Sequence, residues 1–541
     1  MIELTIDGKC LHVETGTTVM DAALQLDIAI PSMCHNGALP RFASCMICLV
    51  KDADTGRLFT SCSVMATPGM NIITMDEEIR EARKTALDLL LSDHVGDCEP
   101  PCQVTCPAHM DIPLMNHLLA DGKFEEAYNV VIQDIALPSI LGRICPAPCE
   151  GACRRNSVDE GVSICFLKMY AGDHHLAFGG PRLRGDDRIE ESENLEIRNP
   201  VLNSEVEDSS NVMADIFVSQ ADERPPLSRE RSERGRGAGG EVDHASRFTH
   251  RVAIIGSGPH GLSAAWYLQS FGYPCTIFDR NPLPGGALRY SVPKVLLPDE
   301  VLDQEIDRIR QAGVTFQMNE EIDSARVKEL EQQYSAVIMP LEKAPTMAIK
   351  SSALGKEDAW KVRQKLSGLP ETGEPRIFNS RFGRLQESEA AEYLKESVPG
   401  ARIEPAQGFT KGMTAKEVIA EAARCLHCEC RKPETCLLRI YSNEYGADQK
   451  RFQGSDRKLV TKQFQHDTVI YEPQKCIKCG ICVRITAKYQ EEYGLTFIGR
   501  GFDVVIGVPF SGSIREGLTR TAEEVANACP TGALAMKGGR K

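Results

Sequence analysis

The sequence predicts a multidomain chain that combines α/β and α+β units, and three patterns support this. Residues 2–14 alternate apolar and polar residues like a β-hairpin, and residues 80–135 have helical periodicity. Residues 250–280 read as a buried strand, a glycine-rich turn, a helix and a second strand. The 541 residues also exceed what one hydrophobic core supports, so several domains are expected.

Composition and charge exclude some classes of function. Hydrophobic residues make up 42% of the chain and charged residues 26%, which is ordinary for a globular protein. The formal net charge of -14 argues against nucleic acid as a partner, because phosphate binding needs a cationic surface. The chain shows neither an apolar run of eighteen residues nor a leader, so we expect a cytoplasmic protein with no membrane span.

Cysteine is the most informative residue type. The chain has 21 cysteines, and without a leader they are not expected to form disulfides, because reducing compartments keep thiols free for metals. Eighteen of them fall into groups with short spacings. Cys10, Cys165 and Cys275 are left over in apolar surroundings, where a cysteine is usually a small buried hydrophobe, and we assign them no function.

The first cysteine group follows the predicted hairpin. It consists of Cys34, Cys45, Cys48 and Cys62, separated by ten, two and thirteen residues. Four thiolates in this arrangement hold a 2Fe-2S cluster, although a structural zinc site also uses CxxC pairs. Residues 1–95 resemble the N-terminal 2Fe-2S domain of the large peripheral subunit of complex I and of iron-only hydrogenases, which favours the cluster.

A second group lies in the predicted helical region, in SDHVGDCEPPCQVTCPAHMDIP and GRICPAPCEGAC. This run resembles the N-terminal domain of the glutamate synthase small subunit and of dihydropyrimidine dehydrogenase, which holds two 4Fe-4S clusters. The resemblance implies that one cluster is bound by Cys98, Cys102 and Cys153, and the other by Cys106, Cys145 and Cys149.

The fourth ligands of these two clusters depart from the family pattern. The family's first cysteine would fall near Val95, and His94 is the nearest residue that can replace a thiolate, since imidazole also ligates iron-sulfur clusters. His94 is therefore a candidate ligand, or alternatively a structural histidine. The family's last ligand, Glu or Gln, would align near Lys168, whose ammonium group cannot ligate iron.

Two further groups lie near the C-terminus. RCLHCECRKPETC could bind a 4Fe-4S cluster or a zinc ion, and the neighbouring groups favour iron. Its candidate ligands are Cys425, Cys428, Cys430 and Cys436. KCIKCGICVR together with ACPTGAL resembles a bacterial-type ferredoxin, and its candidate ligands are Cys476, Cys479, Cys482 and Cys529. Thr486 and Val525 stand where cysteines of a second ferredoxin cluster would be, so one cluster is expected here.

A glycine-rich motif, GSGPHG, follows the strand RVAII. Its Gly256, Gly258 and Gly261 would let a pyrophosphate approach the backbone at a helix N-terminus, and Asp279 ends the next strand, where a ribose-binding acid is expected. The later PGGALRYSVPKVLLP, with Gly285 and Gly286, resembles the FAD domain of the glutamate synthase family.

The rest of that family's flavoprotein unit is not visible in the sequence. No second GxGxxG motif follows, so we infer that the NADPH domain has been deleted. A flavin without a neighbouring nicotinamide site cannot accept hydride from NADPH on the same chain. The remaining Rossmann half either binds FAD or only packs.

These patterns define the predicted architecture. Residues 183–248 are rich in Glu, Arg, Ser, Asp and Gly, which predicts a disordered linker. The predicted segments are a β-grasp 2Fe-2S ferredoxin-like domain (1–80), a helical domain with two 4Fe-4S clusters (81–182), the linker (183–248), a truncated Rossmann FAD-binding domain (249–410), a cysteine-rich segment (411–460) and a ferredoxin-like 4Fe-4S domain (461–541).

The sequence thus predicts an electron-transfer subunit of an oxidoreductase complex rather than the chain that converts the substrate. It would relay electrons among a 2Fe-2S cluster and up to four 4Fe-4S clusters, with FAD as a one-to-two-electron junction. Expected partners resemble formate dehydrogenase, hydrogenase or an NADH-oxidising flavoprotein, or are soluble ferredoxin. The alternatives are a self-contained NAD(P)H-dependent oxidoreductase of the glutamate synthase small-subunit type, and an iron-sulfur redox sensor or scaffold.

Overall fold

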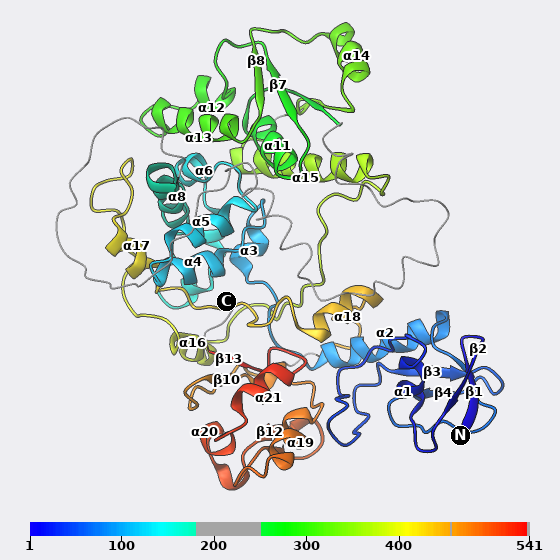
Figure 1. The fold of residues 1–541 in the computed structure, drawn as a ribbon. Coiled ribbons are helices and arrows are strands. Elements are labelled where there is room, and N and C mark those ends of the chain that lie inside the picture. Colours follow the sequence, from blue (N-terminus) through cyan, green and yellow to red (C-terminus); the bar gives the residue numbers. More distant parts are fainter. Residues whose placement is uncertain (180–249, 344, 455–456, 538–541) are drawn as a thin grey trace, which may run out of the picture.

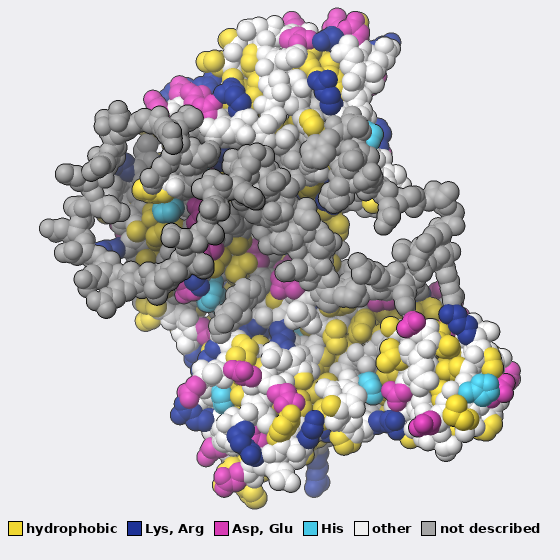
Figure 2. All heavy atoms as spheres, viewed as in Figure 1, with side chains coloured by type: hydrophobic (Ala, Val, Ile, Leu, Met, Phe, Trp, Pro, Cys, Tyr) yellow, Lys and Arg dark blue, Asp and Glu magenta, His cyan; other side chains and the backbone are white. Residues whose placement is uncertain are grey.

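The computed structural model describes residues 1–179, 250–343, 345–454 and 457–537 (Figure 1). The predicted linker 183–248 lies outside these residues. Figure 1 shows the N-terminal sheet unit and the C-terminal unit at one end of the molecule, the helical unit in the middle and the Rossmann-like unit at the other end. On the face in Figure 2, Lys or Arg and Asp or Glu side chains are interspersed over the two terminal units. Within the described ranges no helix is both long and apolar enough to cross a bilayer.

The N-terminal unit is a mixed five-stranded sheet with the order β2-β1-β5-β3-β4. Strands β1 and β2 form the predicted hairpin, β1 pairs with β5 in parallel, and the other pairs are antiparallel. Thr18 caps helix α1, because its side chain accepts the Asp21 N–H at 3.0 Å. The elements are β1 (Ile2–Ile6), β2 (Lys9–Val13), α1 (Val19–Leu24), β3 (Leu49–Asp52), β4 (Leu58–Thr60) and β5 (Asn71–Ile73).

The helical unit begins with helix α2, whose N-cap Asp76 accepts the Ile79 N–H at 2.8 Å. Its apolar core is continuous with that of the Rossmann-like unit, and the Tyr267 hydroxyl donates to the carbonyl oxygen of Ile132 at 3.3 Å. The helices are α2 (Glu77–Ser92), α3 (Pro101–Thr105), α4 (Ile112–Ala120), α5 (Phe124–Ile132), α6 (Pro138–Ile144), α7 (Pro148–Gly151) and α8 (Ile164–His174).

The Rossmann-like unit has four parallel strands in the order β8-β7-β6-β9. After β9 the chain enters the long helix α15, which packs along α11. The elements are β6 (Val252–Ile255), α11 (Pro259–Ser270), β7 (Cys275–Asp279), α12 (Ala287–Tyr290), α13 (Asp299–Gln311), β8 (Thr315–Met318), α14 (Ser324–Gln333), β9 (Ala336–Ile338) and α15 (Ala348–Leu366).

The cysteine-rich segment 411–460 packs on two other units instead of standing alone. Helix α17 packs against α4 of the helical unit, whereas α18 packs against α2. The remaining elements are α16 (Glu387–Leu394), α17 (Ala415–Ala422), α18 (Leu437–Tyr445), β10 (Val469–Tyr471), α19 (Ile481–Lys488), β11 (Thr496–Ile498), β12 (Val505–Gly507), α20 (Ile514–Gly517), α21 (Ala522–Ala528) and β13 (Leu534–Met536).

Arg83 on α2 fastens the N-terminal sheet to α18. Its guanidinium is buried and donates to the carbonyl oxygens of Leu49 at 2.7 Å and Thr74 at 3.0 Å. It also donates to the Tyr445 hydroxyl at 2.9 Å. The buried Arg83 side chain therefore donates to carbonyl oxygens in two parts of the sheet unit. It also binds Tyr445, which is 362 positions later in the chain.

We expect Arg83→Met to destabilise this junction by about 3 kcal/mol, because buried acceptors lose a charged donor. Hydrogen exchange of residues 49–60 in the full chain, followed by mass spectrometry, should then be roughly a hundredfold faster. Lys84→Met on the same helix is the matched control. Unchanged exchange in Arg83→Met would contradict this role.

Candidate functional site

The thiols of Cys34, Cys45, Cys48 and Cys62 converge beside the N-terminal sheet. Hydrogen bonds with Cys45 and then Cys62 lower the pKa of Cys34. A hydrogen bond with Cys62 is the main cause that lowers the pKa of Cys48 to about 7. All four side chains are buried, so the structure brings together the predicted set.

A second group gathers where α6, α7 and α8 meet. It contains the predicted Cys145 and Cys149 together with Cys165, for which the sequence indicates no function. These three thiols and Cys106, which faces the same Lys168, are called the Cys106 group. A hydrogen bond with Cys145 lowers the pKa of Cys165, but contact with Cys149 and burial outweigh it and raise that pKa to about 12. The Cys165 N–H donates to Glu150 Oε1 at 2.8 Å, which fixes the start of α8 beside Cys149.

Lys168 lies one helical turn after Cys165 and faces the same group. Its Nζ is 4.0 Å from the Cys165 Sγ, and its side chain is buried. Burial lowers the pKa of Lys168, but the negative charges of Cys165, Cys145, Cys149 and Cys106 outweigh burial and raise it. A fourth thiol therefore stands three residues before the position where the family pattern puts Glu or Gln. That i, i+3 spacing on one helix was the signal in the sequence.

Cys102 has different neighbours from those expected. Its pKa is raised well above the ordinary value by burial and then by Cys428, Cys153 and Cys425. Burial is likewise the main cause that raises the pKa of Cys425 to about 12, and Cys153 also contributes. Two thiols of the helical unit thus face two thiols of the cysteine-rich segment.

Cys98 faces the other half of that segment. The Cys430 N–H donates to the Cys98 carbonyl oxygen at 3.2 Å. Burial raises the pKa of Cys436, and Cys430 and Cys98 raise it further. Cys98 thus has Cys430 and Cys436 as neighbours, whereas Cys102 has Cys153, Cys425 and Cys428. Cys98 lies before helix α3, Cys102 is on its first turn and Cys106 directly follows its last residue, so the three thiols face different segments.

His94 follows the C-cap of α2 and lies near Lys475 and Glu472. It is buried and donates to the Lys475 carbonyl oxygen, and burial is the main cause that lowers its pKa to about 4. Its Nδ1 atom is buried without a hydrogen-bond partner. A neutral imidazole with a free buried nitrogen has the chemistry of a metal ligand.

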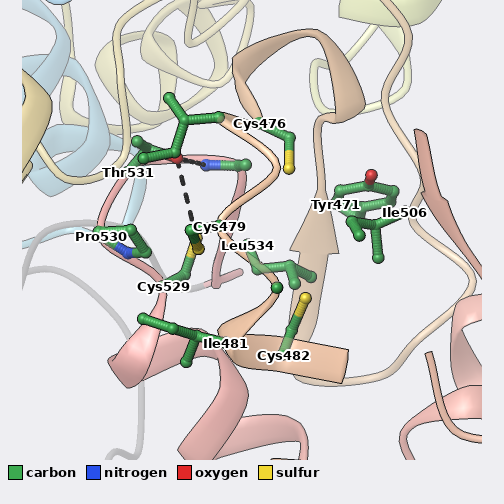
Figure 3. A pocket seen from close by; sticks show the side chains of 13 residues that line it. Tyr471, Cys476, Cys479, Ile481, Cys482, Ile506, Cys529, Pro530, Thr531 and Leu534 are labelled. Carbon is green, nitrogen blue, oxygen red and sulfur yellow. Dashed lines mark hydrogen bonds between the residues drawn. The ribbon is translucent and has the colours of Figure 1, made fainter. Parts of the chain in front are cut away.

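The last group lines an apolar pocket in the C-terminal unit. Figure 3 shows Cys476, Cys479, Cys482 and Cys529 around this pocket, with Tyr471 and Leu534 among its lining. The two positions that lack ferredoxin cysteines serve packing. The Thr486 hydroxyl accepts the Leu495 N–H at 3.1 Å, and Val525 is fully buried.

The N-terminal and C-terminal groups are joined by one side chain. Arg484 on α19 donates through Nη2 to the carbonyl oxygens of Cys34 at 2.8 Å and Cys479 at 3.2 Å. Phe42 also stacks on Phe497, with ring centroids 5.7 Å apart. The two cysteine loops are therefore in direct contact.

The positions of the thiols bear on whether each group could hold a cluster or a single metal ion. Among the described residues no three His, Cys, Asp or Glu side chains surround one position suited to a metal ion. A zinc ion needs its donors about 2.0–2.3 Å from one point, whereas the ligands of a cluster bind different iron atoms. The division of Cys425–Cys436 also separates the four donors that a zinc site would need.

The glycine-rich turn leaves open space above its backbone. Gly256 has φ +96°, and a Cβ at Gly256 or Gly258 would meet no atom within 4 Å. A Cβ at Gly261 would lie 1.9 Å from the Gly256 carbonyl oxygen, so Gly261 is required for the close packing of α11. Gly285 and Gly286 complete the turn: the Gly285 N–H donates to the Ser257 carbonyl oxygen at 3.1 Å, and a Cβ at Gly286 would lie 2.9 Å from the Gly258 Cα.

Asp279 ends β7 and holds this turn. Its carboxylate accepts from the Ser257 N–H at 2.7 Å and hydroxyl at 2.6 Å, and from the Asn281 N–H at 2.9 Å and side-chain amide at 2.8 Å. Burial raises the pKa of Asp279, but these hydrogen bonds outweigh burial and lower it. Since a carboxylate has about four acceptor sites, a ribose hydroxyl would have to displace one of these donors.

The fold and these sites define a multidomain iron-sulfur protein with a Rossmann-like dinucleotide-binding unit. Comparison with protein families agrees. Residues 1–77 match the 2Fe-2S iron-sulfur cluster binding domain, and residues 79–179 match dihydropyrimidine dehydrogenase domain II with its 4Fe-4S cluster. Residues 254–310 match the NAD(P)-binding Rossmann-like domain. The predicted resemblances of these three regions are confirmed.

Individual relatives are redox proteins. The chain is 34% identical over 240 residues to the NADP(+)-dependent formate dehydrogenase subunit beta of Moorella thermoacetica, covering 44% of this chain and 29% of the relative. It is 26% identical over 375 residues to the NADPH-Fe(3+) oxidoreductase subunit beta of Geobacter sulfurreducens, covering 68% and 42%. It is 27% identical over 254 residues to the glutamate synthase [NADPH] small chain of Bacillus subtilis, covering 45% and 40%. The chain thus spans less than half the length of each of these relatives.

Substitutions of Gly258 and Gly261 are expected to have different effects on stability. We expect Gly261→Ala to destabilise the Rossmann-like unit by about 3 kcal/mol, because its methyl group overlaps a backbone carbonyl. Gly258→Ala should cost less than about 1 kcal/mol, because nothing occupies that space. Urea unfolding followed by tryptophan fluorescence reports on this unit alone, because Trp266 and Trp360 are the two tryptophans of the chain. Equal losses of stability in the two variants would refute the assignment.

Proposed function

We propose that this chain is an iron-sulfur electron-transfer subunit of a multi-subunit oxidoreductase. The observation that carries this proposal is the continuity of its cysteine groups. Arg484 joins the Cys34 and Cys476 groups, and the Leu437 N–H donates to the Pro530 carbonyl oxygen at 2.9 Å, between Cys436 and Cys529. Cys102 lies on α3 and Cys106 is the residue directly after it, so about 6 Å of helical rise connects them. A continuous series of groups is what a relay needs.

The proposed ligands are the residues expected from the sequence, together with Cys165. The 2Fe-2S cluster would be held by Cys34, Cys45, Cys48 and Cys62, and the C-terminal 4Fe-4S cluster by Cys476, Cys479, Cys482 and Cys529. The fourth thiol at the Cys106, Cys145 and Cys149 group is Cys165. His94 is the proposed fourth donor beside Cys98, supported by its buried and unpartnered Nδ1 atom. When bound, the clusters accept and release single electrons.

The Rossmann-like unit is proposed to bind FAD, which would supply a junction between one-electron and two-electron transfer. The open backbone at Gly256 and Gly258 supports a pyrophosphate site, and the N-terminus of α11 offers amide donors. Gly285 and Gly286 close the turn from the other side. Asp279 keeps the turn in place.

The proposed partners are other redox subunits that resemble formate dehydrogenase, hydrogenase or an NADH-oxidising flavoprotein, or soluble ferredoxin. The subunit names of the Moorella and Geobacter relatives support a place in a complex.

A second candidate is a self-contained NAD(P)H-dependent oxidoreductase, which the NAD(P)-binding family match favours. Rapid reduction of a dye by NADPH with the purified chain alone would select this second candidate.

The composition of anaerobically purified chain tests the proposal. We expect about eighteen irons, equivalent sulfide, no zinc and one flavin per chain, for one 2Fe-2S and four 4Fe-4S clusters. About fourteen irons with one zinc would mean that one of the four-cysteine sites holds a structural zinc ion instead of a 4Fe-4S cluster. Absence of flavin would leave the Rossmann-like unit as a packing element. Absence of iron would refute the relay.

We expect Lys168→Met to lower the reduction potential of the cluster at the Cys106 group by on the order of 100 mV. Without this cation, addition of an electron to the cluster becomes less favourable by about 2 kcal/mol at the effective dielectric constant of proteins. A redox titration followed by electron paramagnetic resonance (EPR) measures the shift, and Lys123→Met on the exposed surface is the control. An unshifted potential with the cluster intact would contradict the contact.

A further inference from the structure

We propose that the loop Cys425–Cys436 belongs to two clusters at once. Cys425 and Cys428 complete one site with Cys102 and Cys153, and Cys430 and Cys436 build the next site with Cys98. This inference rests on the proposed function for the identity of the clusters, but the pairing of the cysteines stands on the packing of the chain. It replaces both the compact four-cysteine site and the ligand sets implied by the family resemblance.

The first half of the loop is fixed to the helical unit at Cys425 and at the residues just before it. Arg155, two residues after Cys153, donates to the carbonyl oxygen of Arg424. Arg424 in turn donates to the Glu160 carbonyl oxygen at 2.8 Å. Helix α17, which leads into the loop, packs on α4, and Asn116 on α4 forms a hydrogen bond with the Cys425 thiol. These contacts place Cys425 beside Cys153.

The second half of the loop is fixed at Cys98. The Cys430 N–H donates to the Cys98 carbonyl oxygen at 3.2 Å. Arg439, one turn after Cys436, forms a buried ion pair with Glu99. A Cβ at Gly532 would lie 2.4 Å from the Cys430 Sγ, so the loop also packs tightly against the C-terminal unit. These contacts draw Cys430 and Cys436 away from the first site.

The division has a consequence for electron transfer. Cys428 and Cys430 are separated by one residue, so at most about 7 Å of extended backbone connects a ligand of one cluster with a ligand of the next. The left-handed backbone of His427, at φ +44°, turns the loop between Cys425 and Cys428. A single loop therefore sets the spacing of two neighbouring clusters, and a change in its length would alter both.

Paired substitutions in the full chain test the division. Cys102→Ser and Cys425→Ser are expected to abolish the same EPR signal, and Cys98→Ser and Cys430→Ser a different one, with a loss of about four irons in each case. The double variant Cys102→Ser/Cys425→Ser should lose no more iron than either single variant. Cys425→Ser/Cys430→Ser should lose about twice as much. The buried Cys275→Ser is the control.

The opposite pattern would overturn the inference. If Cys425→Ser/Cys430→Ser lost no more iron than Cys425→Ser, the loop would hold one compact cluster. A second measurement covers variants that fail to fold: mild oxidation of the folded wild-type chain releases the metal, and peptide mapping identifies the new disulfides. Links from Cys102 or Cys153 to Cys425 or Cys428, and from Cys98 to Cys430 or Cys436, support the division. Links confined to residues 425–436 refute it, whether or not the chain transfers electrons.

Discussion

Buried thiols from distant parts of the chain must meet, and the rest of the structure depends on this constraint. A thiolate surrounded by other thiolates in a low dielectric is unfavourable unless a metal or a cation compensates it. Cys102 and Cys428 show this, because burial and neighbouring cysteines raise the pKa of both well above the ordinary value. Two of the groups combine thiols of the helical unit with thiols of the cysteine-rich segment, so cluster binding at these groups should contribute directly to the assembly of the units.

Buried cations lie close to these thiols and offset their negative charge. Lys168 faces the Cys106 group, and Arg154 next to Cys153 counteracts the effect of burial on the pKa of Cys428. Lys475 lies near Cys430 and pairs with Glu472 at 2.9 Å. In the proposed relay, each such charge would stabilise the reduced state of a nearby cluster, since a reduced cluster carries an additional electron. The cations thus serve both the stability of the fold and the redox chemistry that we propose.

The order of the groups in space differs from their order in the chain. The N-terminal group contacts the C-terminal group through Arg484, and the C-terminal unit contacts the Cys98 site through Leu437 and Gly532. The shared loop then leads to the Cys102 site, and α3 leads on to the Cys106 site beside the Rossmann-like unit. This sequence of contacts gives a path from the two terminal units into the helical unit, which lies next to the Rossmann-like unit in Figure 1.

The sequence by itself determined the elements that depend on local pattern. The sequence was enough to predict the hairpin at residues 2–13, the turn at Gly256–Gly261 and the cysteine sets around Cys34 and Cys476. Each of these depends on short spacings or on backbone requirements of neighbouring residues. The tertiary structure alone decided how the other cysteines are shared. Cys165 joins its group only because α8 packs against α7. Cys98, before α3, and Cys102, on α3, lie beside different halves of a loop more than 300 positions away. Spacing along the chain cannot reveal such pairings, since the packing of α3, α4 and α17 creates them.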